Sequence, residues 1–161
     1  MQKEFNPKKV WKGEEHPSFV LSDTKAKLFY DFVQKRKGYV YAMQPPDSRG
    51  ILKVGRTSKN PFIRAKNMST AGILGSFELL WVSEFANTPW AESAIHKALS
   101  EYHKEKEFFN VSLLQVKEVF LSYTVKEDAI LTWLQKDILT SKSYEDWVAS
   151  LDIKEVIDNI H

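Results

Sequence analysis

The chain has 161 residues, of which 43% are hydrophobic and 27% charged, so it can form one folded domain with extensions. It contains no cysteine, which excludes disulfides and thiolate metal sites. No apolar stretch approaches the roughly 20 residues that span a bilayer, and the polar, basic segment 1–12 does not resemble a secretory signal. We therefore expect a cytoplasmic protein that has no membrane partner.

The two halves of the chain carry opposite charge. Residues 1–70 hold 15 Lys and Arg against 6 Asp and Glu, whereas residues 71–161 hold 8 against 15. A basic half is typical of proteins that contact the phosphate backbone of a nucleic acid. The alternative is that the two halves neutralise each other across an interface within one domain.

The N-terminal region, residues 1–37, is expected to be a basic arm followed by a helix. Residues 1–20 lack periodicity and contain two X-Pro pairs, so we expect an arm or loop there. A helix begins at Ser22–Asp23, carries an apolar stripe at helical spacing and ends before Gly38. The basic triplet 35–37 suits the negative end of the helix macrodipole, and it could equally contact phosphate.

A hairpin is predicted next. Residues 38–43 are rich in aromatic and β-branched types and form a strand candidate. Residues 45–50 contain two prolines and a glycine and read as a turn, and residues 51–54 form a second short strand.

Two helices and one strand follow the hairpin. Asn-Pro at 60–61 and Thr-Pro at 88–89 each place a capping residue before a proline, which is typical of a helix start. We expect helices from these pairs to about Met68 and to Tyr102, with a strand over 77–82 between them. Residues 107–111 are expected to form a short apolar connector.

The C-terminal region, residues 112–161, is predicted to be an acidic helical extension. It holds 5 Lys against 9 Asp and Glu, and three amphipathic stripes follow one another along it. Ser112 with Gln115, and Asp152 with Glu155, fit capping boxes. An acidic surface is unsuited to lie along DNA, so we expect the extension to pack on the core or to bind a protein partner, a second copy included.

The paired strands carry a family resemblance. The sequence G-Y-V-Y-A-M, then L-K-V-G-R-T, resembles the strands of the GIY-YIG nuclease superfamily, with Tyr39–Tyr41 standing for GIY and Lys53–Gly55 for YIG. Arg64 supplies the arginine of the next helix, Glu92 the glutamate of a later helix, and Asn110 the terminal asparagine. The E-x-x-x-H and E-F-F patterns resemble a branch found in phage and fungal proteins, in which K-[I/V]-G-R-T replaces YIG.

The resemblance covers residues 38–111 and implies a fold and an activity. The fold would be an α/β core with a three-stranded antiparallel sheet flanked by helices, extended by helices at both ends. The activity would be that of a metal-dependent endonuclease that hydrolyses DNA phosphodiester bonds and leaves 5′-phosphate and 3′-hydroxyl ends. The cofactor would be Mg²⁺ or Mn²⁺.

Three residues are the leading candidates for the chemistry. Glu92 would bind the metal, because a hard divalent ion prefers carboxylate oxygen. Arg64 offers a planar fork of donors to the phosphate oxygens, and Tyr41 would position or deprotonate the attacking water. The alternatives are an exposed helix glutamate for Glu92, a phosphate-positioning or surface arginine for Arg64, and a core aromatic residue for Tyr41.

Lys53 departs from the family pattern, because it replaces the YIG tyrosine. It could contact phosphate or favour the phenolate form of Tyr41, and it also fits a catalytically lapsed module that only binds nucleic acid or protein. A third possibility is a regulatory protein whose acidic helices are the functional part. His96 lies four residues after Glu92, on the same helix face, and could ligate metal, accept a proton, orient the carboxylate or be polar surface. Nucleic-acid contacts are assigned to Tyr39, Arg56, Thr57 and Asn110.

Overall fold

The computed structural model describes residues 5–14, 22–69, 75–134 and 136–150. The chain divides into two compact units. One comprises Arg36–Glu127, and the other comprises residues 1–35 with residues 128–161.

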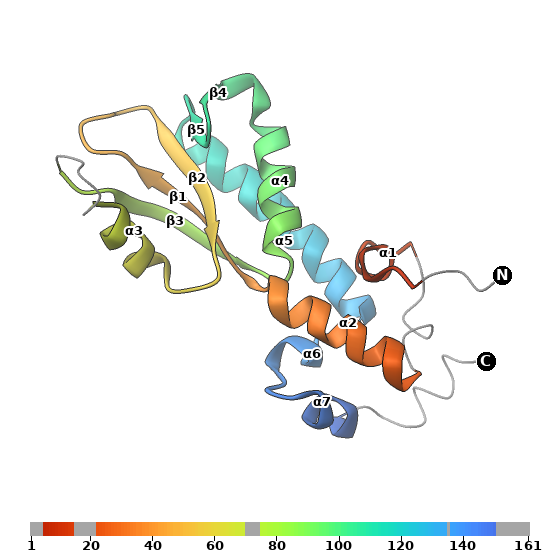
Figure 1. Ribbon diagram of the computed structural model, residues 1–161. Coiled ribbons are helices and arrows are strands. Elements are labelled where there is room, and N and C mark those ends of the chain that lie inside the picture. The colour runs from red at the N-terminus through yellow and green to blue at the C-terminus, as the bar shows by residue number, and fades with distance from the viewer. Residues whose placement is uncertain (1–4, 15–21, 70–74, 135, 151–161) are drawn as a thin grey trace. The chain divides into compact units, whose positions relative to one another are not determined.

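The unit Arg36–Glu127 is built on one antiparallel sheet with the strand order β3-β1-β2-β5-β4 (Figure 1). The strands are β1 (Gly38–Gln44), β2 (Leu52–Thr57), β3 (Glu78–Phe85), β4 (His103–Glu105) and β5 (Phe108–Phe109). β1 lies between β2 and β3, and its Tyr41 is paired with Gly55 on one side and with Val82 on the other. The predicted hairpin and the strand that follows it are therefore present.

The sheet has five strands, so the prediction of a three-stranded sheet is wrong, although the α/β class holds. The helix expected to reach Tyr102 ends at Ala98, and a 3-10 turn, η2 (Ser100–Tyr102), leads into β4. The chain reverses at Lys106, whose φ is 47°, and returns as β5. β5 then pairs with β2, with Phe109 opposite Leu52. The two phenylalanines that were expected to lie in a connector are therefore part of the sheet.

Side-chain caps fix the helices of this unit. α3 (Pro61–Ser69) begins after Asn60, whose Oδ1 accepts a hydrogen bond from the Phe62 N–H at 2.9 Å. α4 (Thr88–Ala98) is capped by Asn87, one residue earlier than expected, and Thr88 donates its hydroxyl to the Arg36 carbonyl at 2.8 Å. α5 (Leu113–Leu134), whose residues from Asp128 onward belong to the other unit, follows the predicted capping box, which Ser112 and Gln115 form with hydrogen bonds of 3.1 and 3.3 Å.

Apolar residues of β1 and β2 alternate between the two faces of the sheet. One face packs on α4 and α5 in a large cluster. This cluster includes Val40, Ala42, Leu52, Val54, Ala91, Ile95, Leu99, Val116 and Phe120. The other face packs on α3 in a smaller cluster of Tyr41, Met43, Ala65 and Phe77. Figure 1 shows α3 on one side of the sheet and α4 on the other.

The other unit contains the helices α1 (Pro7–Trp11), α2 (Asp23–Arg36, whose last residue belongs to the sheet unit), α6 (Asp137–Thr140) and α7 (Tyr144–Ser150). α1 contradicts the expected arm or loop, because Asn6 caps it by accepting from the Lys8 N–H at 3.0 Å. The Tyr30 hydroxyl donates to the Ser141 carbonyl at 2.9 Å. The helix expected over 152–160 lies outside the described residues. Among the described residues, no helix combines the length and apolar character needed to cross a membrane.

Candidate active site

Strand β2 contributes to both faces of the sheet within the segment Lys53–Arg56. Gly55 lies on the face of Tyr41, and a Cβ at Gly55 would stand 2.6 Å from the Tyr41 hydroxyl oxygen and 2.9 Å from its Cζ. The Tyr41 ring therefore crosses from β1 and lies directly over Gly55. This contact explains why glycine occupies position 55, since any side chain would collide with the phenol.

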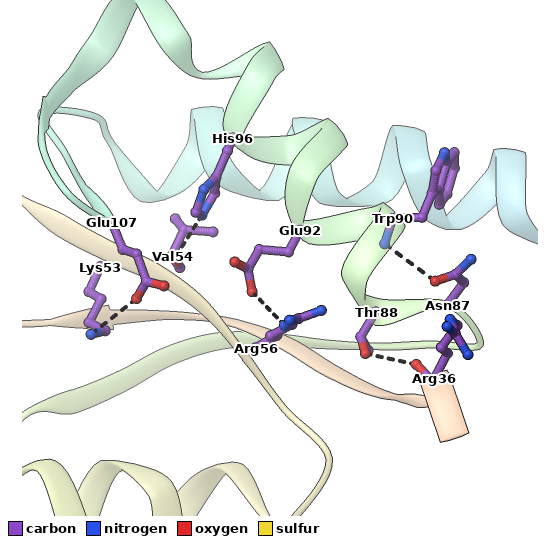
Figure 2. A network of polar contacts seen from close by, with 10 residues as sticks. All are labelled: Arg36, Lys53, Val54, Arg56, Asn87, Thr88, Trp90, Glu92, His96 and Glu107. Carbon is purple, nitrogen blue, oxygen red and sulfur yellow. Dashed lines mark hydrogen bonds and ion pairs between the residues drawn. The ribbon is translucent and has the colours of Figure 1, made fainter. Parts of the chain in front are cut away.

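Glu92 approaches β2 from the opposite face, on helix α4. Its Oε2 lies 3.5 Å from the Nε of Arg56, as Figure 2 shows. The Glu92 side chain is 17% exposed and that of Arg56 is 47% exposed. The Glu92 Oε2 atom is buried and makes no hydrogen bond within the described part of the chain. The ion pair with Arg56 is thus the main compensation for burying this oxygen.

The surroundings of Glu92 set the balance between its charged and neutral forms. Burial is the largest effect and raises the pKa of Glu92 above its ordinary value. The positive charges of His96, Arg56 and Lys53 lower this pKa, and the carboxylate of Glu107 raises it. The net shift is upward, so an additional cation at Oε2 would stabilise the ionised form.

His96 lies one turn after Glu92 and contacts the backbone of β2. Its Nε2 is 2.8 Å from the Val54 carbonyl oxygen, and its ring packs on Phe109 with centroids 5.1 Å apart. Because a carbonyl oxygen only accepts, Nε2 carries the proton, and Nδ1 is the nitrogen left for another partner. The Val54 N–H donates to the Glu107 carbonyl at 2.9 Å, so the Val54 backbone faces away from β1. His96 therefore makes a hydrogen bond to a backbone carbonyl that points away from β1, next to the start of β5.

Lys53 is paired with Glu107, a residue to which the sequence assigned no role. The Lys53 Nζ lies 3.2 Å from the Glu107 Oε2, and the two side chains are 16% and 43% exposed (Figure 2). The ammonium also stands 5.6 Å from the centre of the Phe108 ring. The E-F-F pattern contained Glu107, but only the pairing of β5 with β2 brings it beside Lys53. An influence of Lys53 on Tyr41 stays a prediction.

The remaining predicted residues lie around this centre. Arg64 is exposed on α3, and Asn110 is exposed just after β5, with its N–H bonded to the Tyr102 carbonyl at 2.7 Å. Neither side chain forms a hydrogen bond or ion pair with Glu92 among the residues that the structure describes. Tyr39 pairs with Thr57 across the β1–β2 ladder, and the Thr57 hydroxyl accepts from the Lys59 N–H at 3.1 Å.

The described residues contain no group of three or more His, Asp or Glu that could hold a metal ion. A site with one carboxylate still suits Mg²⁺, which keeps several waters and commonly binds through one or two carboxylates and substrate phosphates. The buried Glu92 Oε2, which lacks a hydrogen bond, is the atom that fits such an ion. Among the described residues, Glu92 is therefore the side chain that could hold such an ion.

Comparisons with known proteins give a family and one relative. The model of the T5orf172 domain matches residues 38–124, which is more than half of the chain. Protein 315L of Invertebrate iridescent virus 6, named as a KilA-N domain-containing protein, is 26% identical over 153 residues. That match covers 84% of this chain and 63% of the relative, so the chain spans less than two thirds of that protein's length. No solved structure is significantly similar to the chain.

Proposed function

The chain belongs to the T5orf172 domain family, and we propose that this domain binds DNA and hydrolyses its phosphodiester bonds as a metal-dependent endonuclease. The reaction class comes from the resemblance of β1 and β2 to the GIY-YIG strands. The observation that carries the proposal is the state of Glu92. A carboxylate with a raised pKa and a buried oxygen lacking a hydrogen bond stands beside cations at a strand edge.

The outer edge of β2 is the proposed position of the scissile phosphate. Within β2, only Leu52 and Lys53 pair with β5. Among the described residues, no strand pairs with Gly55–Thr57 on the side of β2 that faces away from β1. Arg56, the nearest cation to Glu92, is about half exposed there and can donate to a phosphate oxygen. The Tyr41 hydroxyl approaches Gly55 of β2 from the α3 face of the sheet.

Each residue then has a role in the proposed reaction. Glu92 holds Mg²⁺ or Mn²⁺, which when bound offsets the charge that develops on the phosphate and on the leaving oxygen. Arg64 reaches from α3 to the non-bridging oxygens, where its fork of donors is worth most as negative charge builds up. Tyr41 orients the attacking water, and His96 keeps α4 fixed against β2 through the Val54 carbonyl.

A second function, a module that binds DNA without cutting it, is favoured by one observation. Lys53, which stands where the GIY-YIG pattern has its second tyrosine, is already paired with Glu107, and Arg56 is paired with Glu92. A site whose charges neutralise each other pairwise needs no ion to be stable. The two functions differ in whether a divalent ion at Glu92 leads to hydrolysis.

A plasmid assay separates the two. Purified protein is incubated with supercoiled DNA and Mg²⁺ or Mn²⁺, and a parallel sample contains EDTA. The endonuclease proposal predicts nicked and linear products that need the metal, with ends that DNA ligase rejoins because they carry 5′-phosphates and 3′-hydroxyls. Retarded migration of intact plasmid without any cleavage would instead support the binding module.

A further inference from the structure

The region around α3 is strongly basic. Residues 48–77 contain no Asp or Glu, and their cations are Arg49, Lys53, Arg56, Lys59, Arg64 and Lys66. Lys53 and Arg56 are neutralised by carboxylates of neighbouring elements. Arg49, Lys59, Arg64 and Lys66 are exposed, and within the described ranges they form no ion pair. The three that lie on or next to α3, Lys59, Arg64 and Lys66, therefore make an uncompensated positive surface.

Two large apolar side chains lie within this basic surface. Phe62 is 70% exposed and Ile63 is 54% exposed, both in the first turn of α3. Ala65 and Met68 face the sheet, so helical spacing places Ile63 and Lys66 on the opposite side of α3. Phe62 lies on the flank of the helix, one turn before Lys66, and its exposure shows that its ring projects into solvent. An adjacent aromatic and aliphatic pair left in water, on a turn held by the Asn60 cap, indicates a surface that a ligand covers.

We propose that this surface, made of Lys59, Phe62, Ile63, Arg64 and Lys66, docks on duplex DNA with Phe62 inserted as a wedge at a base step. Apolar wedges of this kind partly unstack a step and kink the duplex, while flanking cations bind the phosphates on either side. The inference rests on the DNA-binding part of the proposed function. It adds the class of substrate, which is a duplex that deforms easily, such as one with a mismatch or a flexible pyrimidine–purine step.

Charge distinguishes DNA from a second copy of the chain as the occupant. A two-fold contact through this surface would place the same three cations of both copies against one another, which opposes association. A polyanion gains from each of these cations, and its stacked bases offer an apolar slot for Phe62. The combination of an apolar centre with a purely cationic rim thus favours DNA.

The first experiment uses a duplex with 2-aminopurine beside a mismatch, in EDTA, so that binding is measured without cleavage. Wild-type protein should raise the 2-aminopurine fluorescence as the step is unstacked. Phe62→Ala should abolish this rise and weaken binding by about tenfold, the scale of one aromatic–base contact, with an unchanged salt slope. Leu121→Ala is the matched control, because Leu121 is 52% exposed on α5, outside the proposed surface.

The second arm tests the cations. Lys59→Met and Lys66→Met should each reduce the slope of log affinity against log salt by about 0.9, while the fluorescence rise persists at saturating protein. Phe62 is mostly exposed, so Phe62→Ala should keep the wild-type unfolding temperature. The inference is overturned if Phe62→Ala binds and unstacks DNA like wild type. It is equally overturned if wild type does not bind duplex DNA, or if it is a dimer that Phe62→Ala dissociates.

The outcomes separate this inference from the endonuclease proposal. Unstacking by wild type without cleavage in any metal would leave the wedge standing and remove the nuclease. Metal-dependent cleavage by Phe62→Ala, at wild-type affinity, would support the nuclease and rule out the wedge.

Discussion

The two faces of the sheet are packed to different depths. The face under α4 and α5 buries a large cluster that includes Ile95 and Phe120, both inaccessible to solvent. Among the described residues, the face under α3 buries the smaller cluster of Tyr41, Met43, Ala65 and Phe77, and the outer side of α3 is exposed. Glu92 lies on α4, which covers the face with the large cluster. Phe62 and the exposed cations lie on or next to α3, which covers the face with the small cluster.

This difference indicates that the two faces have different functions, ion binding at α4 and contact with the duplex at α3. A carboxylate that holds an ion must keep its position, and α4 is fixed by its Asn87 cap, by Ile95 in the core and by the His96 contact with Val54. A surface that follows a deformable duplex needs exposed cations, and α3 supplies them.

The largest effect on stability is expected on the deep face. Phe120→Ala should lower the free energy of unfolding by about 3–5 kcal/mol, because it leaves a cavity in a packed core. Phe77→Ala should cost clearly less, since Phe77 belongs to the smaller cluster and is 8% exposed. Urea unfolding of both variants measures the difference. Equal losses would contradict the idea of two unequal faces.

The next effect concerns the thin face and the rate of cleavage. Arg64→Ala should lower the single-turnover rate by about 10²–10³-fold, as expected when a donor to the transition state is removed. Lys66→Ala, two positions along the same helix, should change affinity but leave the rate at saturating protein as in wild type. An unchanged rate for Arg64→Ala would make Arg64 a phosphate contact like Lys66.

A smaller effect is expected at the contact between β1 and β2. Gly55→Ala places a Cβ against the Tyr41 phenol and should cost about 1–3 kcal/mol, the usual range for overpacking. Tyr41→Phe removes the hydroxyl oxygen that comes closest, so the double variant should lose less stability than the two single variants together. Strict additivity in thermal unfolding would show that the ring does not lie over Gly55.

The smallest effect is the pH dependence of stability caused by Glu92. Burial raises its folded-state pKa, so the folded protein binds this proton more tightly than the unfolded chain does. The contribution to stability is therefore complete below the unfolded pKa and is lost as pH rises through the folded value. Glu92→Gln, which is neutral throughout, should gain stability over wild type with rising pH in EDTA. Glu118→Gln on the exposed face of α5 is the control.

The central elements could be predicted from the sequence because their signals are local. Aromatic and β-branched runs indicated β1 and β3, and Asn60 before Pro61 gave the start of α3. The same Asn-Pro signal at Asn6–Pro7 starts α1, but the few residues of that helix show no apolar periodicity, and a loop was expected. Short helices are hard to predict for this reason.

The small hairpin β4–β5 could not be predicted, because its strands are very short and β5 joins the sheet by pairing with β2 over a long sequence separation. β5 has two residues, and β4 is the charged tripeptide His103–Glu105, fully exposed. Its formation depends on the edge of β2, some fifty positions earlier in the chain. The Lys53–Glu107 ion pair follows from that pairing, so it was missed as well. The Arg56–Glu92 pair was missed because the sequence does not give the side of the sheet on which α4 packs.

The most direct test of the account is single-turnover cleavage of one duplex by wild type and by Glu92→Ala, with affinities measured separately in EDTA. The account predicts metal-dependent cleavage by wild type and a rate loss of about a hundredfold or more in the variant, since a bound metal contributes several kcal/mol to such reactions. The two affinities should agree, because Glu92 holds the ion and not the duplex. Wild-type rates in Glu92→Ala, or a parallel loss of affinity, would contradict the assignment of Glu92. Absence of cleavage by wild type on every DNA and RNA tried would leave the binding module as the function.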